Sequence, residues 1–394
     1  EGVDPRITAV SQSAQDRRNQ IDIASAASNL AIPAGTSASI GSGTIIAGGS
    51  VGVNSSDKLN VKITTGAVAG GGLAAGAGVG ILTVDTGSTA QIDGTGTLQA
   101  GAVNVRALTI HTLGGRHFAG TGGLLAAISA DVGVLTDNSR TTAVIRRKAI
   151  STGGAVAVNA SSTRDVSVKA EGVSIAGVLA VGASAGTATI GGTVEAAVSN
   201  SATIGTSGAR AASASVTATA NSTAKTEAYA VGGGIGAAIQ GAGSFATVKP
   251  TVKASVDSAQ IFTSGLTSLG ASSTGSAETL ATGIAVAGGL AAGASLSESE
   301  VASNVSTTVS NGTSIDAGSI DIGSTGNTGL VKSKAIGAAG ALVGLNATVT
   351  KSKNFTNANT LVTGSALKSS GNTTVQANNT TNQFADGTGI AAGL

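Results

Sequence analysis

The two histidines of the chain, His111 and His117, flank the segment Gly114-Gly115-Arg116 and are the first residues to consider for chemistry. Histidine is a common metal ligand, but a usual zinc site needs three or four protein ligands. The chain has no cysteine and no third histidine to complete such a set. We therefore interpret both histidines as surface turn residues and expect no metal or other cofactor.

Two pairs of carboxylates are the next candidates. Glu298 and Glu300 lie in "LSESE", and Asp316 and Asp321 lie in "SIDAGSID". A polysaccharide-cleaving enzyme needs a pair of acids on one face, and Glu298 and Glu300 alternate outward if the segment is a strand. Neither pair has a nearby Arg or Lys cluster or an aromatic sugar platform in the sequence. Solvated strand edges are therefore the favoured interpretation, and we assign no catalytic residue.

The charged residues indicate no nucleic-acid partner, because Lys and Arg number 22, Asp and Glu 20, and the net charge is +2. The short basic cluster Arg146-Arg147-Lys148 is interpreted as a solvated turn. The uncharged stretch Gly66–Leu82 is mostly Gly and Ala, so we predict no membrane span. The chain contains no Gly-Lys dipeptide, which excludes a phosphate-binding P-loop.

An internal repeat organises the chain. In each copy an apolar residue is followed two places later by Ala or Ser. The apolar positions are Val53, Val105, Val158, Val216, Leu269, Ile322 and Val375. Successive positions are 52, 53, 58, 53, 53 and 53 residues apart, and the value of 58 indicates an exposed, turn-like insertion near Thr206–Ala214. A fixed period of this length is typical of solenoids and propellers.

The small-residue heptapeptide "GGLAAGA" follows this period, at residues 71–77 and 288–294. Equivalent small-residue stretches come 20 or 21 residues after the other apolar positions. The segments at those positions alternate apolar and polar residues, as in Ser215–Ala220, which predicts half-buried strands. We predict that the Gly/Ala stretch is a strand buried on both faces, because small side chains let backbones approach closely.

The predicted fold class is therefore all-β, a parallel β-solenoid of about seven repeats of about 53 residues. Aromatic residues make up only 2% of the chain, which disfavours a propeller. We place the solenoid at residues 37–394 and a cap or linker at residues 1–36, and we expect almost no helix outside residues 1–30. Two or three turns per repeat would give a rod on the order of 70–100 Å long, and we expect two.

The segment Ile150–Ala160, "ISTGGAVAVNA", joins an Ile, a glycine turn and a Val-x-Val-x-Ala strand. This pattern resembles the repeats of large secreted bacterial adhesins of the filamentous-haemagglutinin, leukotoxin-type and autotransporter-passenger groups. The resemblance implies an extracellular or cell-surface location and a stalk or filament body for attachment or surface coating, with host or matrix glycans or proteins as partners.

Two other functions stay open at this point. One is a carbohydrate-active β-helix enzyme that uses the carboxylates named above. The other is an ice-binding solenoid built on threonines such as Thr217 and Thr219. The last residues, Thr388–Leu394, echo Thr282–Gly288, so we expect either end-to-end self-association or continuation of the same polypeptide.

Overall fold

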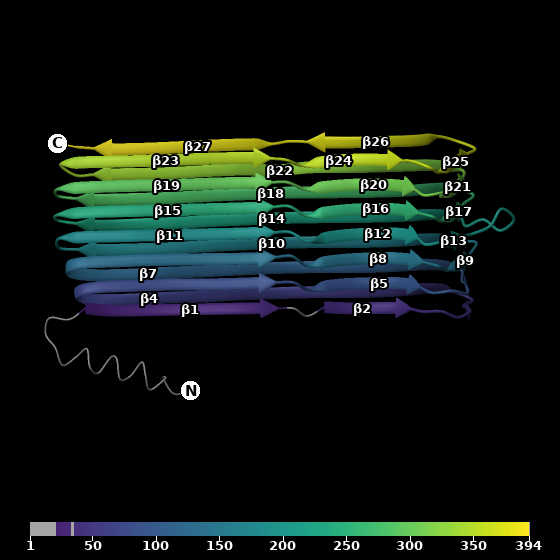
Figure 1. Ribbon diagram of the computed structural model, residues 1–394, viewed down its shortest axis with the longest axis horizontal. Helices are drawn as coiled ribbons and strands as arrows, with labels where there is room; N and C mark the ends of the chain where they lie inside the picture. Colours follow the sequence, from purple (N-terminus) through teal and green to yellow (C-terminus); the bar gives the residue numbers. More distant parts are fainter. Residues whose placement is uncertain (1–20, 33–34, 394) are drawn as a thin grey trace, which may run out of the picture.

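The computed structural model describes residues 21–32 and 35–393, and within these residues the chain forms β-strands and no helix. Neighbouring strands pair in parallel, with partners such as Ala214 and Thr267 from successive repeats. The all-β parallel solenoid is thus confirmed. Because each strand pairs with the equivalent strand of the next repeat, one repeat makes one wide turn (Figure 1), and the expectation of two turns per repeat was wrong.

The largest sheet contains two layers that face each other. Its outgoing strands are β10 (Ala155–Ala176), β14 (Ser213–Gly234), β18 (Leu266–Ala287) and β22 (Ser319–Gly340), followed in the last coil by β26 (Thr373–Thr380) and β27 (Gln383–Ala392). Its return strands are β1 (Ile21–Ile32), β11 (Leu179–Ile190), β15 (Ala237–Val248), β19 (Leu290–Val301) and β23 (Val343–Asn354). The long strands β4 (Ser50–Val84) and β7 (Ala102–Asp137) each run through both layers.

Two short-stranded sheets close the other end of each coil. The second sheet stacks β2 (Gly35–Ile40), β5 (Gly87–Asp93), β8 (Arg140–Arg146), β12 (Thr193–Ser199), β16 (Thr251–Asp257), β20 (Asn304–Ser310) and β24 (Asn357–Val362). The third sheet stacks β3 (Ile45–Ile46), β6 (Thr97–Gln99), β9 (Ala149–Ser151), β13 (Thr203–Ile204), β17 (Gln260–Phe262), β21 (Ser314–Ala317) and β25 (Ala366–Ser369). We call this side of the molecule the three-sheet end.

The core becomes thinner away from the three-sheet end. At that end Val, Ile and Leu side chains from all three sheets pack together, among them Val105, Ile145 and Ile150. Where the outgoing strands turn back into the return strands, the buried hydrophobic residues are alanines. They are Ala127, Ala176, Ala180, Ala238, Ala285, Ala291 and Ala339. We call this opposite side the reversal edge.

The Gly/Ala stretch forms the reversal edge and is buried on one face only. Ala74 is buried, whereas Leu73 beside it is 37% exposed, so the prediction of burial on both faces was wrong. The close approach is between the inner faces of the two layers. A Cβ atom added to Gly78 would lie 2.7 Å from the backbone oxygen of Phe118, which leaves no room for a side chain there.

The irregular spacing at the insertion has two sources. Val198 pairs with Ile145 whereas Thr203 pairs with Ala149. The turn between β12 and β13 is therefore one residue longer than the equivalent turn between β8 and β9. Ser213 pairs with Ala155, so the loop between β13 and β14 adds the other four. This loop is exposed at Thr206–Ala209, as predicted, and projects from the three-sheet end (Figure 1).

The stack is wider than it is tall. An outgoing strand has 22 residues, which at about 3.3 Å each gives roughly 70 Å. Seven stacked strands span only about 29 Å at about 4.8 Å per step, so the expected long rod is instead a flat slab. Strands β1 and β2 pair with β4 and β5 and extend the coil pattern upstream of residue 37. Residues 1–20 of the predicted cap or linker lie outside the described residues.

Candidate functional site: polar clusters inside and on the coils

Both histidines lie inside the solenoid, and their prediction as surface turn residues was wrong. His111 is 1% exposed and His117 is fully buried, and both belong to β7. They share the inward side of this strand with Val105 and Leu113, because every second residue of a strand points to the same face. This alternation was visible in the sequence and would have placed both histidines in the interior.

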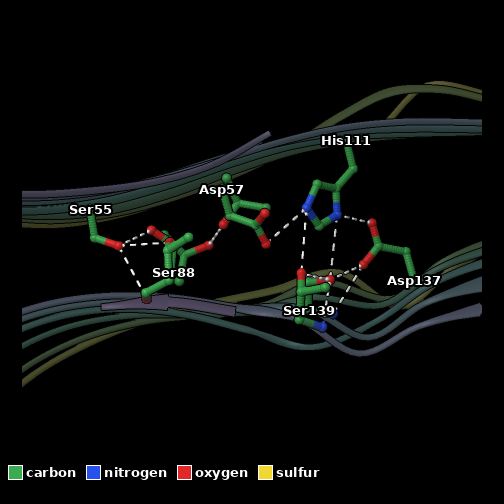
Figure 2. A network of polar contacts seen from close by, with 10 residues as sticks. Ser55, Asp57, Ser88, His111, Asp137 and Ser139 are labelled. Carbon is green, nitrogen blue, oxygen red and sulfur yellow. Dashed lines mark hydrogen bonds and ion pairs between the residues drawn. The ribbon is translucent and has the colours of Figure 1, made fainter. Parts of the chain in front are cut away.

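His111 is the centre of a polar network that joins two layers (Figure 2). Its Nδ1 lies 2.9 Å from Asp137 Oδ2, and its Nε2 lies 3.3 Å from Asp57 Oδ2. Ser139 donates from its hydroxyl to Asp137 Oδ1 at 2.6 Å and from its backbone N–H to the same oxygen at 3.0 Å. Thr86 donates to Ser139 Oγ at 3.1 Å. The network therefore connects the outgoing strands to the corner that follows the return strands.

The residue types Ser139, His111 and Asp137 match a Ser-His-Asp triad, but their geometry does not. In a catalytic triad the serine and the carboxylate contact opposite nitrogens of the ring. Here both face Nδ1, and Ser139 Oγ lies 3.4 Å from it. All three side chains are buried, so a substrate has no access to the hydroxyl. The arrangement supports a structural role rather than nucleophilic catalysis.

Arg164 supplies positive charge beside this network. Burial alone would raise the pKa of Asp137, but hydrogen bonds from His111 and Ser139 and the charges of Arg164 and His111 hold it below its usual value. Burial lowers the pKa of Arg164, and the Asp137 charge opposes this effect. Arg164 Nη1 donates to the backbone oxygen of Gly191, whereas its Nε and Nη2 have no hydrogen-bond partner among the described residues. Two carboxylates, a histidine and an arginine thus lie together in or beside the core.

His117 and Asp131 form a second buried polar region nearer the reversal edge. His117 Nδ1 lies 2.7 Å from Thr65 Oγ1, and burial lowers the pKa of this histidine. Its ring occupies space left by glycines, since a Cβ atom on Gly80 would lie 2.0 Å from it. Asp131 accepts a hydrogen bond from the backbone N–H of Glu171 at 2.9 Å. Burial is the main reason that the pKa of Asp131 rises to about 7.

The basic cluster divides between surface and core. Arg147 is a turn residue with φ of +54° and forms an exposed ion pair with Asp93 at 2.8 Å. Lys148 is fully buried, contrary to the prediction of a solvated turn. Its ammonium donates to the backbone oxygens of Gly43 at 2.6 Å, Gly41 at 3.2 Å and Thr95 at 3.3 Å. Arg164 and Asp131 were not among the candidate residues, although the strand alternation places both inside.

The carboxylates Glu298 and Glu300 are half-exposed on the outer face of β19, as their alternation predicted. Glu298 is an ion-pair partner of Lys353 and lies 4.0 Å from Lys351. These lysines come from the next coil of the chain, so the sequence segment around Glu298 gave no sign of them. The Glu298 carboxylate therefore forms a contact between two coils.

Asp316 and Asp321 lie on different sheets, on β21 and β22. Asp316 is bound by Arg210 at 2.9 Å and lies 3.5 Å from Lys368. The Arg210 hydrogen bond is the main reason that the pKa of Asp316 is below its usual value. A general acid in glycoside hydrolysis needs a raised pKa, so Asp316 is poorly suited to this role. Asp321 lines an open groove of about 620 Å³ beside Asn372 and Gln376.

The threonines do not form a continuous array across the coils. Thr217 stacks on Asn159 on one side and on Gly270 on the other. Thr219 stacks on Ser161 and Ser272. A flat ice-binding face would need the same side chain in every coil, and this register lacks it.

These observations define the protein as a parallel β-solenoid whose buried polar groups connect its coils. Within the part of the chain that the structure describes, no three His, Asp or Glu side chains are placed to hold a metal ion, and no helix is long and apolar enough to cross a membrane. No protein-family model, curated protein or solved structure matches the chain. The resemblance to adhesin repeats therefore stays a prediction.

Proposed function

We propose that the chain is the structural stalk or filament body of a bacterial cell-surface or extracellular adhesin and has no catalytic activity. The observation that carries this proposal is the register of the stack. From β1 to β27 equivalent residues of successive repeats lie one above another, and their small and β-branched side chains form continuous inner columns. A stack in which each repeat contacts only its neighbours forms an extended body, as a stalk requires.

Ion pairs on the outer faces support the same role, because they connect one coil to another. Arg116 pairs with Glu171 of the following coil at 3.1 Å. Arg210 spans two coils, since it donates to both the backbone oxygen of Thr263 and the Asp316 carboxylate. Each exposed pair contributes little stability by itself. Together they favour one register among the many that a repetitive sequence offers.

The last described coil supports end-to-end association. Strands β24, β25, β26 and β27 each pair on one side only among the described residues. Val375 continues the inner column of the buried Ile322 but is 49% exposed. An unpaired strand edge with apolar residues can pair with a further strand. We propose that a second copy, or further coils of the same polypeptide, covers this surface.

Electron microscopy and analytical ultracentrifugation of the purified chain test the proposal. We expect particles that lengthen with protein concentration and are built from slabs stacked along the coil axis. Val375→Lys should weaken this association, because it places a charge on the end surface. Thr217→Lys, on the outer face of the central strand β14, is the matched control and should associate like the wild type. A wild-type protein that stays monomeric at every concentration would contradict end-to-end stacking.

Assays on a broad glycan panel separate this proposal from the enzymatic alternative. We expect no turnover by the wild type. Turnover that is lost in Glu298→Gln or Asp316→Asn would replace the structural proposal with a carbohydrate-active enzyme.

A further inference from the structure

The reversal edge has an uncharged outer surface in successive coils. The segments that build it are residues 67–81, 119–133, 172–186, 230–244, 283–297 and 336–350. Their only charged residue is Asp131, whose side chain is buried. Charged residues are instead found further along the strands and at the three-sheet end, where Arg147 and Asp93 form one of the ion pairs. The slab is therefore amphipathic along its long axis.

Large aliphatic side chains project from this edge. Leu124 is 79% exposed and Ile235 is 78% exposed, although both are at the corner of a coil. Others with more than half of their surface exposed are Val68, Leu125, Ile175, Val178, Val286, Leu342, Val343 and Leu345. Exposed aliphatic side chains repeated in successive coils point to a site of interaction with a protein or a membrane.

The backbone of the corners is hydrogen-bonded from coil to coil. Val178 donates to the backbone oxygen of Leu125 at 3.3 Å, and Ile235 donates to Gly177 at 3.1 Å. Val343 donates to Gly289 at 2.9 Å in the same manner. Backbone polar groups must be paired internally before a structure can enter hydrocarbon. At these three positions the corner amides meet this requirement.

Aromatic and charged residues lie together at the inner boundary of the uncharged segments that build the reversal edge. The chain has only one Tyr and five Phe, and Phe118, Tyr229 and Phe245 are at this boundary. Phe118 and Tyr229 both stack on Glu171, and the Lys169 ammonium lies 5.4 Å from the centre of the Tyr229 ring. Rings beside Lys and Arg side chains are typical of residues at a membrane–water interface.

The depth of these uncharged segments fits one leaflet of a bilayer. Phe118 precedes the corner at Leu124 by six residues, or roughly 20 Å of strand. Half of a hydrocarbon core is about 15 Å thick, and the headgroup region lies beyond it. The aliphatic tips would thus reach into the acyl chains while the aromatic residues stay at headgroup level.

We propose that the reversal edge inserts into the surface of a lipid bilayer, with the three-sheet end in water. A second protein copy fits the surface less well. Protein interfaces concentrate aromatic residues and arginine at their centre, whereas this surface is aliphatic at its centre and has its aromatic residues at the boundary. The charges at the boundary have both signs, as in the Lys169–Glu171 pair at 2.8 Å, so binding should not require anionic lipid.

Flotation with phosphatidylcholine vesicles tests this proposal on the whole chain. We expect the wild type to float with the vesicles and to do so equally in 0.5 M salt. The double variant Ile235→Asp/Leu342→Asp should lose at least about tenfold in vesicle affinity, since charged groups are excluded from hydrocarbon. Ile46→Asp is the matched control, because Ile46 is 75% exposed on the third sheet, at the opposite end. Both variants replace exposed residues, and equal thermal unfolding curves would confirm that they fold.

A fluorescence measurement gives the orientation. The chain has no Trp, so Leu124→Trp places one reporter at the reversal edge and Ile46→Trp places one at the other end. We expect vesicles to shift the emission of the first variant to shorter wavelength and to leave the second unchanged. A wild type that does not float, but whose self-association is lost in Ile235→Asp/Leu342→Asp, would overturn the proposal and identify a second copy as the occupant. Absence of both flotation and self-association would also overturn it.

Discussion

At the scale of single residues, the buried groups make stability depend on pH. The ordinary pKa of Asp131, 3.8, rises to about 7 in the folded protein, chiefly because burial disfavours the carboxylate. Between these values the folded protein keeps a proton that the unfolded chain releases. The free energy of unfolding therefore falls as the pH rises from about 4 to about 7.

Asp131→Ser should remove this loss, since Ser184 stacks on the same position and fits the coil. We expect the variant to be more stable than the wild type at pH 8, by on the order of 2–4 kcal/mol, because one pKa unit corresponds to about 1.4 kcal/mol. At pH 4 the difference should be small. Urea unfolding at both pH values measures it, and an equal gain at pH 4 and pH 8 would contradict the titration of Asp131.

His117 acts in the opposite direction. Burial lowers its pKa below 6.5, so the unfolded chain binds a proton first as the pH falls, and the free energy of unfolding decreases below pH 6.5. Ala170 stacks on this position, so an alanine fits there. His117→Ala should remove the decrease in the free energy of unfolding below pH 6.5, whereas Asp131→Ser should leave that decrease unchanged. The two variants thus serve as controls for each other in the same urea titration.

The His111 network should be sensitive to the loss of any one member. Leu59 stacks on His111, so His111→Leu introduces a side chain that this column already accepts. It nevertheless leaves the buried Asp137 without its histidine partner, and breaking a buried charged set costs about 3–5 kcal/mol. We expect a loss of this size in the free energy of unfolding at pH 7. A loss below about 1 kcal/mol would show that the network contributes little to stability.

Strand alternation was enough to predict which side chains point inward, but not which of them meet. The sequence around His111 places it on the same face as Leu113. Its contact with Asp137 depends on how far the chain travels before it reverses, because Asp137 lies 26 residues further on. No local pattern measures that distance. The same limit applies to Lys353 and Glu298, whose contact depends on the number of turns per repeat.

At the scale of the elements, the sequence was sufficient to predict the period of the repeat. It was not sufficient to predict where the outgoing strand turns back into the return strand. Strands β4 and β7 continue through the corner, where their pairing shifts register only between Gly71 and Leu73, and the Gly/Ala residues there differ from those of the neighbouring strand only in size. A stretch of small residues is compatible with a thin core and with a strand buried on both faces. The choice depends on the opposite layer, which the local sequence does not specify.

The loop between β13 and β14 provides a test at this scale. Deletion of residues 206–209 removes the four extra residues and keeps Arg210, which binds Asp316. Loop length changes the free energy of closure only slowly, so we expect the shortened chain to unfold within a few degrees of the wild type. Arg210→Ala in the same background is the comparison that isolates the ion pair. A large loss of stability on deletion alone would show that the loop supports the coil.

At the scale of the whole molecule, the one-turn repeat fixes the shape. Small-angle X-ray scattering of the monomer should give a long dimension of roughly 70 Å or slightly more, set by the 22-residue strands. Chains with fewer coils should keep this dimension and lose only height, by about 5 Å per coil. A long dimension that instead scales with the number of coils would indicate a rod with two turns per repeat.

The constant separation between paired residues also governs how the chain folds. Each new strand finds its partner one repeat back, as Thr267 finds Ala214, however many coils already exist. The entropic free-energy cost of closing that loop is about 3.5 kcal/mol from the (3/2)RT ln n relation, where n is the number of residues between the paired positions. This cost is therefore the same for every coil. Growth from an existing coil becomes a series of equal steps, like the extension of a crystal from a seed. Once a first pair of coils has formed, the time to complete the fold should increase in proportion to the number of coils, and a chain that emerges gradually from a pore could fold as it appears.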